Sequence, residues 1–65
     1  MKVEMLEAYP RFREFRVSLP DGNAHNIALT QDGDPLKKVD SFCRRHGLDP
    51  LVLLAEMVRA EKQAA

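Results

Sequence analysis

Cysteine and histidine are the residues most able to carry out chemistry in this 65-residue chain, which contains one Cys and two His. Cys43 and His46 are three residues apart, a spacing that puts two side chains on one face of a helix, and His25 could approach them from another segment. Zinc requires further ligands in tetrahedral geometry, and a catalytic thiolate requires an electropositive, partly open site. We therefore interpret Cys43 as a small core residue and His46 as a helix-end residue. We expect no metal, no cofactor and no enzymatic activity.

Basic and aromatic residues are interleaved in a second segment, where Arg11, Arg13 and Arg16 alternate with Phe12 and Phe15. This pattern provides the charges and stacking surfaces that single-stranded nucleic-acid binding uses. The chain has ten basic and ten acidic residues and no net charge, so no overall field attracts a nucleic acid or an anionic membrane. We keep nucleic-acid binding by this basic patch as an alternative. The favoured interpretation is a strand whose basic face is simply solvated.

The middle of the chain has the pattern of a β-hairpin. Apolar and polar residues alternate over residues 12–19, and the alternation returns over residues 24–30. The intervening Pro-Asp-Gly-Asn sequence at 20–23 favours a tight turn, because proline fixes φ and Gly or Asn accepts positive φ. Residues 1–8 are mixed in pattern, since Leu6 breaks their alternation, and we expect a short edge strand or an arm there.

Two helices are predicted from their start and stop signals. Asp34 followed by Pro35 is typical of a helix N-terminus, and Gly47 can take the left-handed conformation that ends a helix. These signals predict a helix over 34–47 with one apolar face. Asp49 and the proline after it repeat the start signal and predict a second helix over 49–63.

The second predicted helix is apolar over an unusually wide arc, roughly 200° when drawn at 100° per residue. A helix that faces a single core needs about half of that arc, so two apolar surfaces are predicted. We expect four residues to pack on the hairpin and the first helix: Leu51, Leu54, Ala55 and Val58. Three residues would then remain for a partner: Leu53, Met57 and Ala60.

Together these elements predict an α+β fold, a small antiparallel hairpin or three-stranded meander followed by two helices packed on one face. Residues 1–65 are expected to form a single small domain. The longest apolar run, residues 51–55, is far too short to span a membrane, and a signal-peptide core is lacking, which favours a reducing, cytoplasmic setting. The predicted core contains Phe15, Val17, Leu19, Ile27, Leu29, Leu36, Val39, Phe42, Leu48, Leu54 and Val58.

A family resemblance is carried by the helix signals and core positions that follow the Asp-Gly turn of the hairpin. These positions are Asp34-Pro35, Val39, Phe42, His46 and Leu48. Through them, residues 33–57 resemble the C-terminal half of ubiquitin-binding domains of the phospholipase A2-activating-protein type, the PFU family. The resemblance implies a compact module that binds ubiquitin through a surface patch, and Leu53 with Met57 would supply the apolar contacts here. Family members usually lie in larger proteins, whereas a chain running from Met1 to Ala65 is expected to be complete.

The function that the sequence favours is therefore a non-enzymatic protein-interaction or self-association module that uses the excess apolar surface of the second helix. A 65-residue chain buries only about 60% of its unfolded surface, so an added interface would also supply stability. Ubiquitin binding is one alternative, and single-stranded nucleic-acid binding through Arg11, Arg13 and Arg16 is another.

Overall fold

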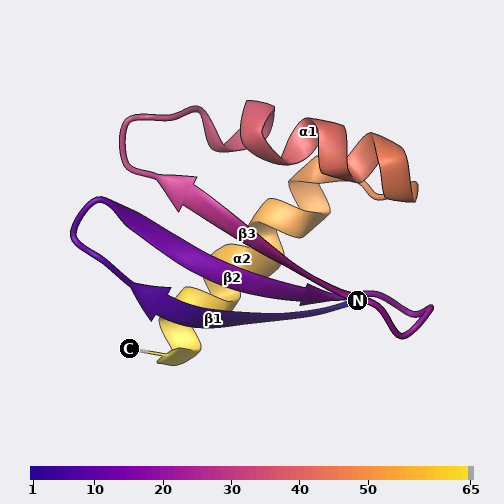
Figure 1. Ribbon diagram of the computed structural model, residues 1–65, viewed down its shortest axis with the longest axis horizontal. Helices are drawn as coiled ribbons and strands as arrows, with labels where there is room; N and C mark the ends of the chain where they lie inside the picture. Colours follow the sequence, from indigo (N-terminus) through magenta and orange to yellow (C-terminus); the bar gives the residue numbers. More distant parts are fainter. Residues whose placement is uncertain (65) are drawn as a thin grey trace.

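The computed structural model describes residues 1–64, so Ala65 of the predicted domain lies outside the described residues. Three antiparallel strands form one sheet in the order β1-β2-β3, and two helices follow (Figure 1). This confirms the predicted α+β fold and selects the three-stranded meander. The elements are β1 (Lys2–Ala8), β2 (Phe12–Ser18), β3 (Ala24–Thr30), α1 (Pro35–His46) and α2 (Pro50–Ala64).

The turn between β2 and β3 closes as its sequence predicts. Gly22 has a φ of 91°, a conformation that other residues rarely adopt. The backbone N–H of Leu19 donates to the carbonyl oxygen of Asn23 over 2.8 Å. The backbone N–H of Asn23 in turn donates to Oδ1 of Asp21 over 2.9 Å, and this bond holds the pKa of that carboxyl below its usual value. The turn therefore fixes the register of the hairpin.

A β-bulge explains the irregular pattern of the first eight residues. Met5 pairs with Phe15, but Glu7 pairs with Glu14, so Leu6 is an extra residue on β1. Before the bulge, Val3 and Met5 are half-buried and pack against the core. The N-terminal segment is thus an edge strand, and the break at Leu6 marks the bulge.

α1 begins and ends at the predicted signals, and α2 begins at its predicted start signal. Oδ1 of Asp34 accepts the N–H of Leu36 over 3.0 Å, and Oδ1 of Asp49 accepts the N–H of Leu51 over 2.9 Å. Gly47 ends α1 with a φ of 66°, and the N–H of Leu48 donates to the carbonyl oxygen of Cys43 over 2.8 Å. The helix boundaries are therefore determined by local sequence.

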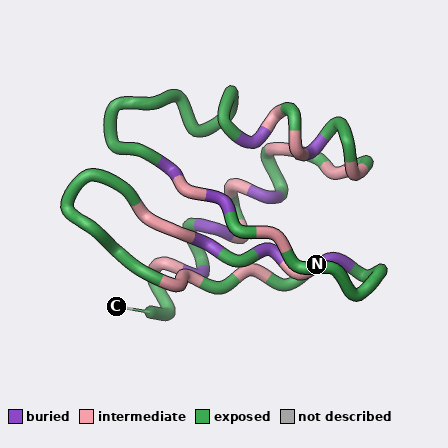
Figure 2. Tube along the Cα trace, viewed as in Figure 1, coloured by how far each residue is buried: buried purple, intermediate pink, exposed green. Residues whose placement is uncertain are grey.

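The helices and the sheet share one core. α2 crosses diagonally behind the strands and lies closest to β1, while α1 runs beside β3 and contacts α2 (Figure 1). Figure 2 shows buried residues along β2 and β3 and at intervals along both helices, while most of the loops are exposed. The buried core consists of Phe15, Val17, Leu19, Ile27, Leu29, Val39, Cys43, Leu53, Met57 and Ala60.

Comparison with the predicted core gives two corrections. The prediction is right for Val39 and for every core position chosen on β2, β3 and the turn after β2, while Phe42, Leu48 and Leu54 are half-buried against the core. Leu36 and Val58 are exposed, contrary to the prediction. Leu36 lies in the first turn of α1, next to Pro35, which borders two surface hollows. Val58 is exposed because α2 is rotated relative to the prediction, as described below.

Two phenylalanines of β2 provide a matched test of this core. Phe15 is 1% exposed and Phe12 is 37% exposed. Phe15→Ala should lower the free energy of unfolding by about 3–5 kcal/mol, because it leaves a cavity in the only core among residues 1–64. Phe12→Ala loses mainly the stacking on Tyr9, whose ring centroid lies 4.3 Å away, and should cost about 1 kcal/mol or less.

Urea denaturation followed by circular dichroism measures both values. Equal losses in the two variants would show that the sheet does not pack through Phe15 as described.

Candidate functional site

The two histidines lie together in an aromatic cluster between β3 and α1. The ring centroids are 4.8 Å apart for His25 and His46, 5.2 Å for His25 and Phe42, and 4.6 Å for Phe42 and His46. Nε2 of His25 is buried and has no hydrogen-bond partner within residues 1–64. In that part of the chain, no group of three or more His, Cys, Asp and Glu side chains could hold a metal ion. The cluster therefore joins the hairpin to α1 by aromatic packing.

Cys43 is not placed to act as a nucleophile or a metal ligand. Its side chain is buried in the core, and this burial raises the pKa of the thiol, with smaller contributions from the carboxylates of Asp40 and Asp49. A raised pKa keeps the thiol protonated, whereas a nucleophile or a metal ligand must be a thiolate. The position of Cys43 agrees with its interpretation as a small core residue.

The three arginines of the predicted basic patch do not share one surface, which corrects that prediction. Arg13 lies on the side of β2 that faces α2, and its Nη1 donates to both carboxylate oxygens of Glu61, with Oε1 at 2.8 Å. Arg16 is exposed and pairs across the sheet with Glu4. Arg13 and Arg16 are three residues apart on a strand, so their side chains leave from opposite faces. Arg11 is exposed in the turn between β1 and β2.

The predicted partner surface on α2 is also wrong, because the helix is rotated so that this surface faces inward. Leu53 is 0% exposed, Met57 is 1% exposed, and Ala60 is buried as well. These three residues pack in the core that the helices share with the sheet. They are therefore not available to a partner in the folded chain.

Three of the four residues predicted to pack inside face outward on α2 instead, while the fourth, Leu54, is half-buried against the core. Leu51 is 67% exposed, Val52 is 52% exposed, and Val58 is 54% exposed, and Ala55 is exposed between them. At 100° per residue, Leu51, Ala55 and Val58 fall within roughly 60° of arc, on the side of the helix opposite the core. We call Leu51, Val52, Ala55 and Val58 the outer face of α2.

The sequence alone does not orient this helix, because both apolar stripes reach a charged residue near its end. One turn after Val58 the outer stripe meets Lys62, which is exposed, and one turn after Met57 the buried stripe meets Glu61, which pairs with Arg13 of β2. The wide apolar arc was visible in the sequence, but the pairing of Glu61 with a distant strand distinguishes the side that faces the sheet.

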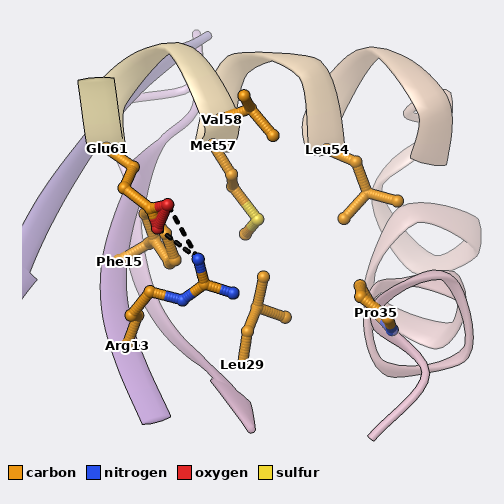
Figure 3. A pocket seen from close by; sticks show the side chains of 8 residues that line it. All are labelled: Arg13, Phe15, Leu29, Pro35, Leu54, Met57, Val58 and Glu61. Carbon is orange, nitrogen blue, oxygen red and sulfur yellow. Dashed lines mark hydrogen bonds and ion pairs between the residues drawn. The ribbon is translucent and has the colours of Figure 1, made fainter. Parts of the chain in front are cut away.

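An apolar groove of about 200 Å³ adjoins the outer face of α2. Figure 3 shows Leu54 and Met57 of α2 pointing into it towards Leu29 of β3 and Pro35 of α1. The ion pair between Arg13 and Glu61 closes one end of the groove, and both side chains are partly exposed there. Val58 lines the groove and also belongs to the outer face, so the two form one continuous apolar surface. The groove is lined by Arg13, Phe15, Leu29, Pro35, Leu54, Met57, Val58 and Glu61.

Comparisons with protein-family models, with curated proteins and with solved structures find no match to this chain. Within residues 1–64, neither helix has the length and apolar character needed to cross a membrane.

The ion pair between Arg13 and Glu61 should contribute measurably to stability, because it joins β2 to the C-terminal half of α2. A double-mutant cycle with Arg13→Gln and Glu61→Gln should give a coupling free energy of about 0.5–1 kcal/mol at low salt, since both side chains are about 40% exposed. The coupling should shrink in 1 M NaCl because exposed charges are screened. A coupling of zero at low salt would contradict this contact.

The raised pKa of Cys43 predicts a component of stability that is lost in alkaline solution. As the pH rises through the ordinary cysteine pKa of about 8.5, the unfolded chain releases the thiol proton first, while burial keeps the proton on the folded chain. The unfolded state then binds fewer protons, so the free energy of unfolding falls with rising pH. Urea denaturation between pH 7 and pH 10 should show this decline in the wild type and a smaller decline in Cys43→Ala, which lacks the thiol.

Proposed function

We propose that this chain is a non-enzymatic protein-interaction module that acts through the outer face of α2. The observation that carries the proposal is the exposure of Leu51, Val52 and Val58 on one helix whose opposite side is fully buried. Single exposed apolar residues are common on proteins, but a contiguous apolar surface is typical of a binding site. The single buried thiol of Cys43 suits a reducing compartment, so we place the module in the cytoplasm.

The outer face has the composition of a binding surface with a polar rim. Its centre is aliphatic, and Arg59 and Lys62 lie beside it on the same helix. Arg59 also pairs with Glu56 over 3.5 Å, which places one acidic group at the rim. An apolar centre that excludes water and a charged rim that orients the partner are general features of protein interfaces.

Ubiquitin is a second candidate partner, because it offers an apolar patch and this surface is apolar and basic. Leu53 and Met57, where contacts with ubiquitin were expected, are buried. Binding of ubiquitin would therefore have to use the outer face of α2, with Arg59 and Lys62 at its edge. Nucleic-acid binding receives less support, since Arg13 and Arg16 lie on opposite sides of β2 and Arg13 is paired.

The test of the proposed site uses Val58→Glu, with Asn26→Glu as a control of equal charge change. Val58 is exposed on α2, and Asn26 is exposed on β3, where it pairs with Arg16 on the sheet face turned away from the helices. Neither variant should change the free energy of unfolding by more than about 0.5 kcal/mol. Amide chemical shifts of the labelled chain are recorded on dilution from high concentration and on titration with ubiquitin.

Association through the outer face should shift the amide resonances of α2. Val58→Glu should weaken this association at least about tenfold, because a charge is then buried at the interface without a partner. Asn26→Glu should leave it unchanged. Association that survives Val58→Glu, or that maps to the sheet instead, would place the binding site elsewhere.

A further inference from the structure

We infer that the partner of the outer face is a second copy of this chain, docked with the two α2 helices side by side and antiparallel. This inference rests on the proposed function of the outer face and adds the identity of its occupant.

The apolar residues of the outer face are complementary to themselves in an antiparallel pair. If the two-fold axis passes between Leu54 and Ala55, then Leu51 of each copy lies opposite Val58 of the other. At the centre, Leu54 of each copy lies opposite Ala55 of the other, so a large side chain meets a small one. Ala55 lets the helices approach closely, and Leu54 is already half-buried at the edge of the groove.

The charges of the helix ends favour the same arrangement. Asp49 is exposed at the N-terminus of α2, and Arg59 and Lys62 are exposed near its C-terminus. In the antiparallel pair, Asp49 of one copy lies at the same height along the helices as residue 60 of the other, between the levels of the two basic residues. Opposite charges then meet at both ends, and the helix dipoles oppose each other. A parallel pair would instead place Arg59 and Lys62 beside their own counterparts.

The size of the surface predicts a weak dimer. A specific interface buries about 1,000 Å² in total, or about 500 Å² from each copy, and this chain exposes 4673 Å². About a tenth of the surface must therefore be covered, which requires the length of α2 and the adjoining groove around Pro35 and Val58. We expect the molar mass to rise from monomer towards dimer over roughly 10 µM to 1 mM, at the weak end of the interface range.

Light scattering or sedimentation over this concentration range measures the association. The wild type and Asn26→Glu should approach twice the monomer mass at the highest concentration, and Val58→Glu should remain monomeric. A wild type that stays monomeric at 1 mM would overturn the inference. Ubiquitin-induced shifts of the α2 amides that Val58→Glu abolishes would support the proposed function even if no dimer forms, so failure of the dimer and failure of the binding face remain distinguishable.

Disulfide trapping tests the orientation, using variants at exposed positions of α2. A55C places its thiol next to the two-fold axis, so this variant should form a disulfide-linked dimer under mild oxidation. V58C alone should crosslink at least about tenfold more slowly, since the two copies of residue 58 are about 10 Å apart along the helices. A mixture of L51C and V58C should give the mixed dimer. The wild type measures the background from Cys43, which is buried.

Rapid crosslinking of V58C with itself, and none in the mixture, would overturn the antiparallel arrangement in favour of a parallel one. Equal crosslinking of all variants would show random collision and would overturn the specific dimer.

Discussion

The packing of α2 on the sheet is the contact on which the rest of the structure depends. An isolated helix of 15 residues is marginal in water, so α2 owes its stability and its rotation to the residues that it buries. Leu53 and Met57 are fully enclosed, and Glu61 binds Arg13 of β2 across the end of the groove. Because this contact fixes the rotation of the helix, it also decides which residues form the outer face. The core and the proposed binding surface are therefore two consequences of one packing event.

A bulge in β1 affects the part of the sheet that contacts α2. The bulge at Leu6 gives β1 one extra residue, which keeps Met5 beside Phe15 in the core and brings Ala8 opposite Arg13 at the other end of the strand. The small side chain of Ala8 stands next to Arg13, the residue that binds Glu61. All ten buried apolar residues belong to one cluster shared by strands and helices. No layer within residues 1–64 has a core of its own, so sheet and helices should fold together as a unit.

Local signals in the sequence predict the fold. The candidate site depends on how α2 is rotated, and contacts between residues far apart in the chain determine that rotation. Asp34, Gly47 and Asp49 act on the backbone within a few residues, so both ends of α1 and the start of α2 were correctly predicted from the sequence. The rotation of α2 depends on residues far away in the chain. The stripes that start at Leu51 and Leu53 are similar in apolar character. The contact that distinguishes them is the ion pair of Arg13 with Glu61, which joins residues 48 positions apart. The basic patch was wrong for a simpler reason, since strand alternation already separates Arg13 from Arg16.

A helix that is apolar on two opposite sides is typical of an inner layer, but in this chain α2 packs on the sheet and on α1 and leaves its other apolar side exposed. The sheet occupies the side of α2 that carries Leu53, and the opposite side carries Leu51 and Val58. A two-fold pair would place the two helices in the centre and the two sheets outside. The outward sheet faces would then carry pairs such as Glu4 with Arg16, which are suited to water. In that arrangement every apolar stripe has a partner and every charged strand face is solvated, which is the condition that a layered α+β structure must satisfy.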